Sequence, residues 1–159
     1  VDFQVEGDIA TSFGDFRGSV LWSRNLNYDL QSFAGDSPSD LVGLYTGSSF
    51  AENKANITLG WKQDRLGVTY LGEYISGMEA DTTFSFLTDY VQDLDDEIYH
   101  DLIVDYQMGE DRNGLISVGI TNFTDEAPPY IDTGFNANTD PSTFRLFGRS
   151  YFVRLKYSL

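Results

Sequence analysis

The chain has 159 residues, of which 41% are hydrophobic and 15% aromatic, and its formal net charge is -15 at pH 7. This charge argues against sequence-independent binding to nucleic acid, because the phosphates would be repelled. The absence of cysteine excludes disulfides and thiolate metal sites. No apolar run approaches the roughly 18 residues of a membrane helix, so a β-barrel is the membrane-spanning structure still open to this chain.

Seven segments are predicted to be β-strands, and most of them alternate apolar and polar residues with a period of two. The first residues read as a strand and not as a signal peptide, so we expect the chain to begin inside a structure. The last segment, SYFVRLKYSL, places Arg154 and Lys156 on the face opposite its apolar residues. In chain order the predicted strands are residues 1–9, 16–30, 54–62, 66–75, 98–108, 115–123 and 150–159.

The connections between these segments alternate between short and long. Turn-sized connections at 11–15, 63–65 and 109–114 are rich in Gly, Asp and Asn, whereas the others span about 31–51, 76–97 and 124–149. A strand of about ten residues rises ~33 Å, and a tilt near 45° projects this to ~23 Å, close to the apolar band of an outer-membrane barrel. The pattern therefore predicts an all-β, antiparallel transmembrane meander, the alternative being a soluble antiparallel sheet with one wet face.

Two further patterns agree with a barrel wall. The second face of each strand carries charged and polar side chains, which suit a wet lumen or a polar plug better than a dry core. Aromatic residues near strand ends suit interfacial girdles, namely Trp22, Tyr28, Trp61, Tyr74, Tyr99, Tyr151 and Tyr157. Since bacterial single-chain barrels have an even number of strands and at least eight, we expect these seven to be part of a larger barrel.

The stretch from 121 to 159 closely resembles the carboxy-terminal end of TonB-dependent outer-membrane receptors. That family's last hairpin commonly reads V-x-N-L-F-D-x-x-P-P, then N-x-D-P-x-T-Y, then G-R-x-Y-F-V-x-L-x-Y-x-F. The matching residues are Asn122, Phe123, Asp125, Pro128, Pro129, Asn136, Asp140, Pro141, Thr143, Gly148, Arg149, Tyr151, Phe152, Val153, Leu155 and Tyr157. Phe144 stands where the family commonly has Tyr, and Leu159 stands where it commonly has Phe.

The resemblance implies that residues 1–159 are the C-terminal section of a 22-stranded barrel, with strands 16 to 22 present and the plug domain and TonB box absent. It implies a location in the outer membrane of a Gram-negative bacterium, among lipid and lipopolysaccharide. The complete protein would take up a scarce ligand, such as a siderophore–iron complex, cobalamin or an oligosaccharide, with energy from the TonB complex delivered through the plug. The stand-alone alternative is a porin-like or structural outer-membrane β-barrel protein.

The final strand also resembles the signal read by the barrel-assembly machinery, in which alternate apolar residues end in an aromatic at the terminus, the alternative being a plain lipid-facing strand. The predicted signal residues are Tyr151, Val153, Leu155, Tyr157 and Leu159.

We find no catalytic constellation, metal site or cofactor motif. His100 is the single histidine, so neither a histidine cluster nor a Ser-His-Asp triad can be built from this chain. From Leu66 to Asp111 there are twelve acidic residues and no Lys or Arg, which predicts a solvated acidic loop or a region that attracts cations. Within it, residues 84–94 have the spacing of a short helix. The residues that bind the ligand stay unknown. Five loop aromatics could stack on it, the alternative for each being a girdle or loop-packing role: Tyr45, Phe50, Tyr90, Tyr130 and Phe135.

Overall fold

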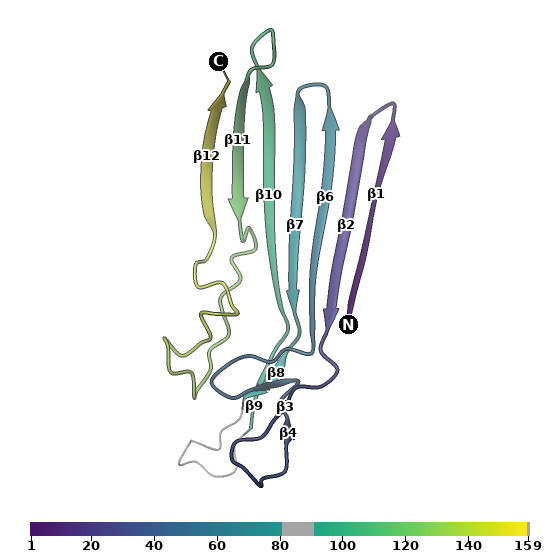
Figure 1. Cartoon of the computed structure of the whole chain (residues 1–159). Coiled ribbons are helices and arrows are strands. Elements are labelled where there is room, and N and C mark those ends of the chain that lie inside the picture. Colours follow the sequence, from purple (N-terminus) through teal and green to yellow (C-terminus); the bar gives the residue numbers. More distant parts are fainter. Residues whose placement is uncertain (81–90, 159) are drawn as a thin grey trace.

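The computed structural model describes residues 1–80 and 91–158. Within those ranges the chain forms strands and no helix, and so contains no helix that could cross a membrane. Seven long strands form one antiparallel sheet in the order β1-β2-β6-β7-β10-β11-β12 (Figure 1). They span Asp2–Thr11 (β1), Gly14–Arg24 (β2), Asn53–Gln63 (β6), Leu66–Ile75 (β7), Glu97–Met108 (β10), Gly114–Thr121 (β11) and Ser150–Tyr157 (β12).

Tight turns join the strands at one end of the sheet, and long connections lie at the other end, here called the turn end and the loop end (Figure 1). Asp64 and Gly109 have φ values of 50° and 84°, the left-handed conformation that such turns require. Gly14, with φ of 118°, leaves no room for a side chain, because a Cβ atom there would lie 2.6 Å from the Lys62 carbonyl oxygen. The predicted alternation of short and long connections is confirmed.

The long connections contain short strands of their own. In the first, β3 (Asp29–Leu30) pairs with β4 (Ser39–Asp40). A second small sheet joins β5 (Leu44–Tyr45), β8 (Met78–Ala80) and β9 (Gln92–Leu94). Part of the segment predicted as a short helix, 92–94, is therefore strand, and most of the remainder lies outside the described residues.

All seven predicted long strands are present, but the second and sixth end earlier than expected. The second ends at Arg24 instead of residue 30, because Asn25 turns into the loop, with its amide donating to Glu52 O and its Nδ2 to Ala51 O, both at 2.8 Å. The sixth ends at Thr121 because Asn122 takes a φ of 51°.

The register brings the apolar positions of all seven strands onto one face, here called the apolar face. One row across it reads Ile9, Phe16, Trp61, Val68, Val104, Val118 and Val153, each residue being paired with the next. The opposite, polar face carries the row Ala10, Asp15, Lys62, Gly67, Asp105, Ser117 and Arg154. The parity predicted strand by strand is therefore consistent across the whole sheet.

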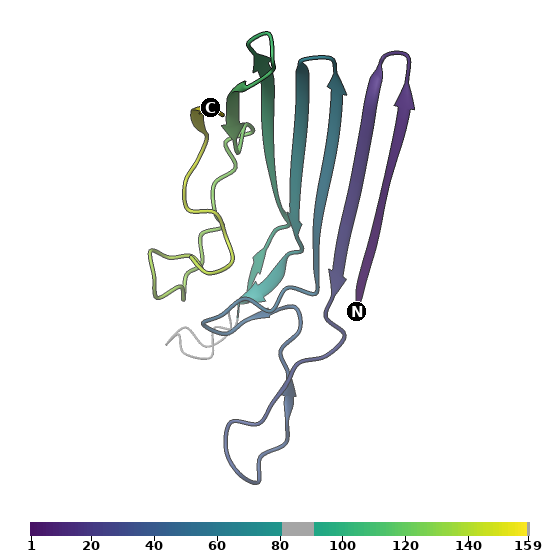
Figure 2. The same ribbon diagram turned by 45° about the horizontal axis from the view of Figure 1, so that its top comes forward.

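The sheet is a single layer, and its apolar face is uncovered along its length (Figures 1 and 2). Buried apolar residues gather instead at the loop end, where the small sheet and the last long connection pack on the polar face of β7 and β10. This cluster comprises Tyr45, Ala51, Ile75, Met78, Ala80, Leu94, Tyr99, Ile131 and Phe144. Tyr99 is fully buried here, so its assignment to an interfacial girdle was wrong, because position 99 belongs to the polar face.

Candidate functional site

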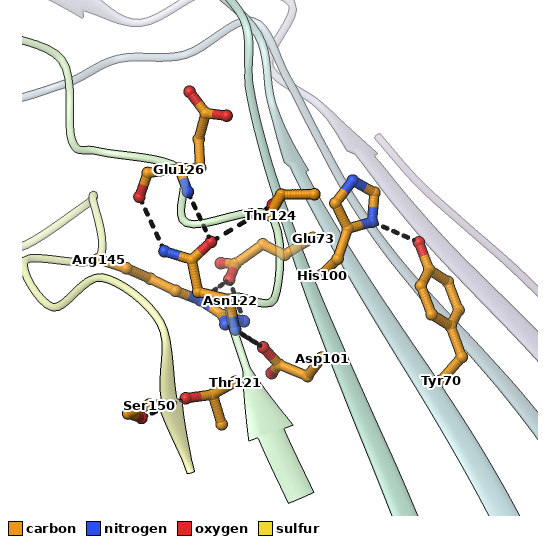
Figure 3. Close-up of polar contacts among 10 residues, drawn as sticks. All are labelled: Tyr70, Glu73, His100, Asp101, Thr121, Asn122, Thr124, Glu126, Arg145 and Ser150. Carbon is orange, nitrogen blue, oxygen red and sulfur yellow. Dashed lines mark hydrogen bonds and ion pairs between the residues drawn. The ribbon is translucent and has the colours of Figure 1, made fainter.

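Arg145 joins the last long connection to the polar face at the loop end of the sheet (Figure 3). Its Nη2 lies 2.8 Å from Glu73 Oε2 on β7, and its Nη1 lies 2.7 Å from Asp101 Oδ1 on β10. The guanidinium also lies over the Tyr99 ring, 5.2 Å from its centroid. Burial alone would lower the pKa of Arg145, but the hydrogen bonds and charges of Asp101 and Glu73 outweigh it and raise the pKa. We call this group the Arg145 clamp.

Asn122 organises the turn by which the chain leaves β11. Its backbone N–H donates to Asp101 Oδ1 at 2.8 Å, the same oxygen that Arg145 contacts. Its side chain then closes the turn, with Nδ2 donating to Glu126 O at 2.8 Å and Oδ1 accepting from Glu126 N at 2.9 Å (Figure 3). Asn tolerates the left-handed φ of 51° at this position better than most residues, so this buried asparagine has both a conformational and a hydrogen-bonding role.

Asp140 connects the last long connection to the first. Its carboxylate accepts from Ser142 N and from Ser49 N, both at 3.0 Å, and Ser49 lies 91 residues away in sequence. Its carbonyl oxygen accepts from Phe144 N at 2.9 Å, so Asp140 opens a tight turn that places Phe144 in the buried cluster. Burial raises the pKa of Asp140, but hydrogen bonds from Ser142 and Ser49 outweigh it, and the net pKa is lowered.

Asp125 fixes the entry into β12. Its Oδ1 accepts from Arg149 N at 2.7 Å, while its Oδ2 lies 3.6 Å from Arg149 Nη2. A Cβ atom at position 148 would come within 2.6 Å of Asp125 Oδ1, which explains the glycine there. Several residues of the recognised 121–159 motif thus hold the last connection in place.

The pattern of the sequence did not point to Arg145 or to its acidic partners Glu73 and Asp101. A usable signal was present, since both carboxylates fall on the polar parity of their strands, in a stretch without Lys or Arg. Buried carboxylates require a cationic partner, and that partner comes from a connection whose path the strand pattern does not predict.

The four described residues of the predicted assembly signal lie on the apolar face of β12. Tyr151, Val153, Leu155 and Tyr157 are 65% to 70% exposed, and β12 has no neighbour on its second side among the described residues. Leu159 lies outside the described residues. An open strand edge with an apolar face is the geometry that the signal requires, while its role in assembly remains a prediction.

The loop aromatics proposed for ligand stacking divide into two groups. Tyr45 is only 3% exposed and belongs to the buried cluster, which agrees with loop packing and not with ligand stacking, and the Phe50 ring packs against Tyr28 with ring centroids 4.7 Å apart. Tyr130 and Phe135 are 64% and 96% exposed and stay available for contact. Tyr90 lies outside the described residues.

His100 occupies a position on the apolar face near the loop end. Its Nδ1 lies 2.7 Å from the Tyr70 hydroxyl (Figure 3), and its ring lies 5.4 Å from that of Phe123. The contacts with Tyr70 and Phe123 give this histidine a packing and hydrogen-bonding role within the sheet. Among the described residues, no group of three or more His, Cys, Asp or Glu side chains is arranged to hold a metal ion.

Neither a family model nor a curated protein matches the sequence. Among solved structures, the crystal structure of the siderophore receptor PirA from Acinetobacter baumannii is similar, with a TM-score of 0.57 and 18% sequence identity. The similarity covers 97% of this chain and 21% of that chain. The seven-stranded sheet therefore has the fold of a section of that receptor, and this chain spans about a fifth of the receptor's length.

Proposed function

We propose that this chain is the C-terminal section of the β-barrel of a TonB-dependent receptor in a bacterial outer membrane. The complete receptor takes up a scarce ligand, such as a siderophore–iron complex, cobalamin or an oligosaccharide, with energy from the TonB complex that reaches it through a plug domain. Further partners are the rest of the barrel, the barrel-assembly machinery, membrane lipid and lipopolysaccharide. The similarity to a siderophore receptor supports the receptor class, and the 121–159 motif supports the family and the position in the chain.

The observation that carries the proposal is the uncovered apolar face. Its row from Ile9 to Val153 is apolar in all seven strands, while the opposite face carries Asp, Lys, Arg and Ser at the same level. Soluble monomers rarely expose contiguous apolar patches beyond a few hundred Å². A membrane removes this cost, because lipid covers the apolar face and the polar face lines a wet interior.

The two edges of the sheet support a larger barrel. Six successive antiparallel pairings leave β1 and β12 pointing in the same direction, and both have an open side in the described part of the chain. Pairing them with each other, or with the edges of a second copy around the same axis, would create a parallel seam. An antiparallel barrel thus requires an odd number of further strands between β12 and β1, which agrees with fifteen strands from the rest of a 22-stranded barrel.

The face assignment is tested in the full-length protein by Val153→Arg, with Arg154→Val on the opposite face of the same strand as the matched control. A cation on the lipid face near mid-bilayer costs about 2 to 4 kcal/mol, so Val153→Arg should reduce the heat-modifiable, folded barrel in outer-membrane fractions. Arg154→Val should leave it largely intact. Equal assembly of both variants would contradict the membrane assignment.

The receptor assignment is tested by uptake. Cells that express the full-length protein should accumulate one of the three ligand classes only when the TonB complex is intact. Uptake that is independent of TonB, or a full-length protein without a plug domain, would instead identify a porin-like barrel.

A further inference from the structure

The apolar face is not uniformly filled, because two glycines lie directly opposite each other on it. Gly7 of β1 pairs with Gly18 of β2, and the next residue along this row is Leu59 of β6. A Cβ atom added at Gly7 would meet no heavy atom within 4 Å, and one added at Gly18 would meet Leu59 Cδ2 at 3.6 Å. On the side of β2 and β6, both positions therefore have room for a side chain that the sequence does not supply; the other side of β1 is an open edge of the described sheet.

A hollow of about 620 Å³ lies over this glycine pair. Its walls include Phe16, Trp61 and Val68, which lie in the next row of the apolar face. Its floor includes Leu59 and Tyr70, which lie in the same row as the two glycines. The volume lies in the range of about 300 to 1,000 Å³ found for small-ligand sites. We call this hollow the glycine groove.

The depth of the glycine groove restricts what can occupy it. Gly7 is five residues from the loop end of β1 and four from its turn end. With a rise of ~3.4 Å per residue and a tilt near 45°, these separations are about 12 Å and about 10 Å along the membrane normal. The groove would then open at the middle of the apolar band, which is about 25 Å tall. Polar headgroups do not reach that level, whereas hydrocarbon chains do.

Trp61 indicates the side from which an occupant enters. Its indole lies between the groove and the turn end, and its Nε1 donates to Phe13 O in the β1–β2 turn at 2.9 Å. Tryptophan with its N–H towards the turn and its ring on the apolar face is the arrangement typical of a membrane interface. An occupant that is continuous with the turn-side leaflet therefore passes Trp61 before it reaches Gly7 and Gly18.

We propose that the glycine groove is a binding site for one acyl chain of a phospholipid in the turn-side leaflet. The inference rests on the proposed function, because it requires the apolar face to lie against lipid. An acyl chain matches the groove in polarity, in depth and in continuity with the surrounding bilayer. It would fill the volume that Gly7 and Gly18 leave open, where the remainder of the apolar face is filled by side chains.

The test uses the full-length protein in vesicles of phosphatidylethanolamine that carries a photoreactive diazirine near the distal end of an acyl chain, with adducts located by mass spectrometry. Val118 is the depth-matched reference, since it also lies four residues from the turn end of its strand. We expect adducts to concentrate on residues 7–18 and 59–70 relative to residues 116–120. Filling the groove with Gly7→Leu, or independently with Gly18→Val, should reduce them to the reference level, whereas Val118→Phe should not.

The outcomes distinguish a failure of the groove proposal from a failure of the membrane assignment. Equal labelling of the groove and the Val118 region, or labelling unchanged in folded Gly7→Leu and Gly18→Val proteins, overturns the groove and leaves a lipid-facing barrel. Labelling around Val118 with none at the groove shows that protein covers it, which also overturns the proposal. Absence of labelling on both regions overturns the proposed function itself.

Discussion

Replacing Arg145 by Ala should release the last long connection from the polar face of the seven-stranded sheet. The change removes ion pairs to Glu73 and Asp101 and leaves those carboxylates without their cation. Breaking a fully buried pair in this way costs about 3 to 5 kcal/mol, whereas an exposed pair is worth at most about 1 kcal/mol. The Arg145 and Glu73 side chains are each 32% exposed and Asp101 11%, so we expect an intermediate cost of about 2 kcal/mol.

This cost is local and is measured by amide hydrogen exchange in the full-length protein in detergent micelles. If the connection opens locally without global unfolding, a loss of about 2 kcal/mol speeds exchange by about 30-fold. The effect should appear in peptides that cover 122–145, including the Asn122 amide that donates to Asp101. Amides in the middle of β11 should retain their protection.

Arg149→Ala is the matched control, since it removes an arginine from the same connection. Its ion pair with Asp125 is longer, at 3.6 Å, and both side chains are more than 40% exposed, so exchange in 122–145 should change little. Protection in 122–145 that is unchanged in the Arg145→Ala protein, or reduced equally by both substitutions, would refute the clamp as the main attachment of this connection.

Three further predictions concern β11 and the last long connection. The pKa of Asp140 is lowered on folding, so its stabilisation is present above the unfolded value of about 4 and is lost as pH falls through the folded value; protection factors in 136–144, corrected for the intrinsic exchange rate at each pH, should therefore fall as the pH is lowered below about 4, and an Asp140→Asn protein that kept the same pH dependence would contradict this. Gly119→Val should displace the Phe152 ring, whose Cε1 lies 2.3 Å from the added Cβ position. The free energy of unfolding should fall by about 1 to 3 kcal/mol, measured as a lower unfolding midpoint in urea. Gly148→Val should push Asp125 away from the Arg149 amide and cost about 1 kcal/mol, seen as faster exchange at Arg149 with β11 unchanged.

The strands were predictable from sequence because a sheet with one apolar face imposes a period of two on every strand. The row from Ile9 to Val153 shows this, since parity assigned separately in each segment agrees across all seven. The prediction failed where the period continued by chance into a loop, as at Leu26 and Tyr28 beyond the end of β2. There, hydrogen bonds from Asn25 to the distant residues Ala51 and Glu52 decide the path.

The loop-end contacts were much less predictable. The motif between 121 and 159 indicated that Asn122, Asp125 and Asp140 matter, but not that they make turn and inter-loop hydrogen bonds. Arg145 contacts Asp101 and Glu73, which are separated from it by 44 and 72 positions in the sequence. No local periodicity encodes such a separation. Tyr99 was misassigned for a different reason. Aromatic residues near strand ends suit either a girdle or a packed loop, and position 99 shares the polar parity of Asp101 and Asp105, which already argued against a girdle.

The connection between β2 and β6 has two parts with very different burial. Its tip, from Asp29 to Asp40, is exposed throughout and is held by the short β3–β4 pair, whereas Leu41, Tyr45 and Ala51 are buried. Insertions are tolerated where few buried contacts and hydrogen bonds are broken. An epitope tag placed near Gly35 should therefore be accessible to antibodies without loss of the folded sheet, while the same tag near Ala51 would force apart loops that share one packed core.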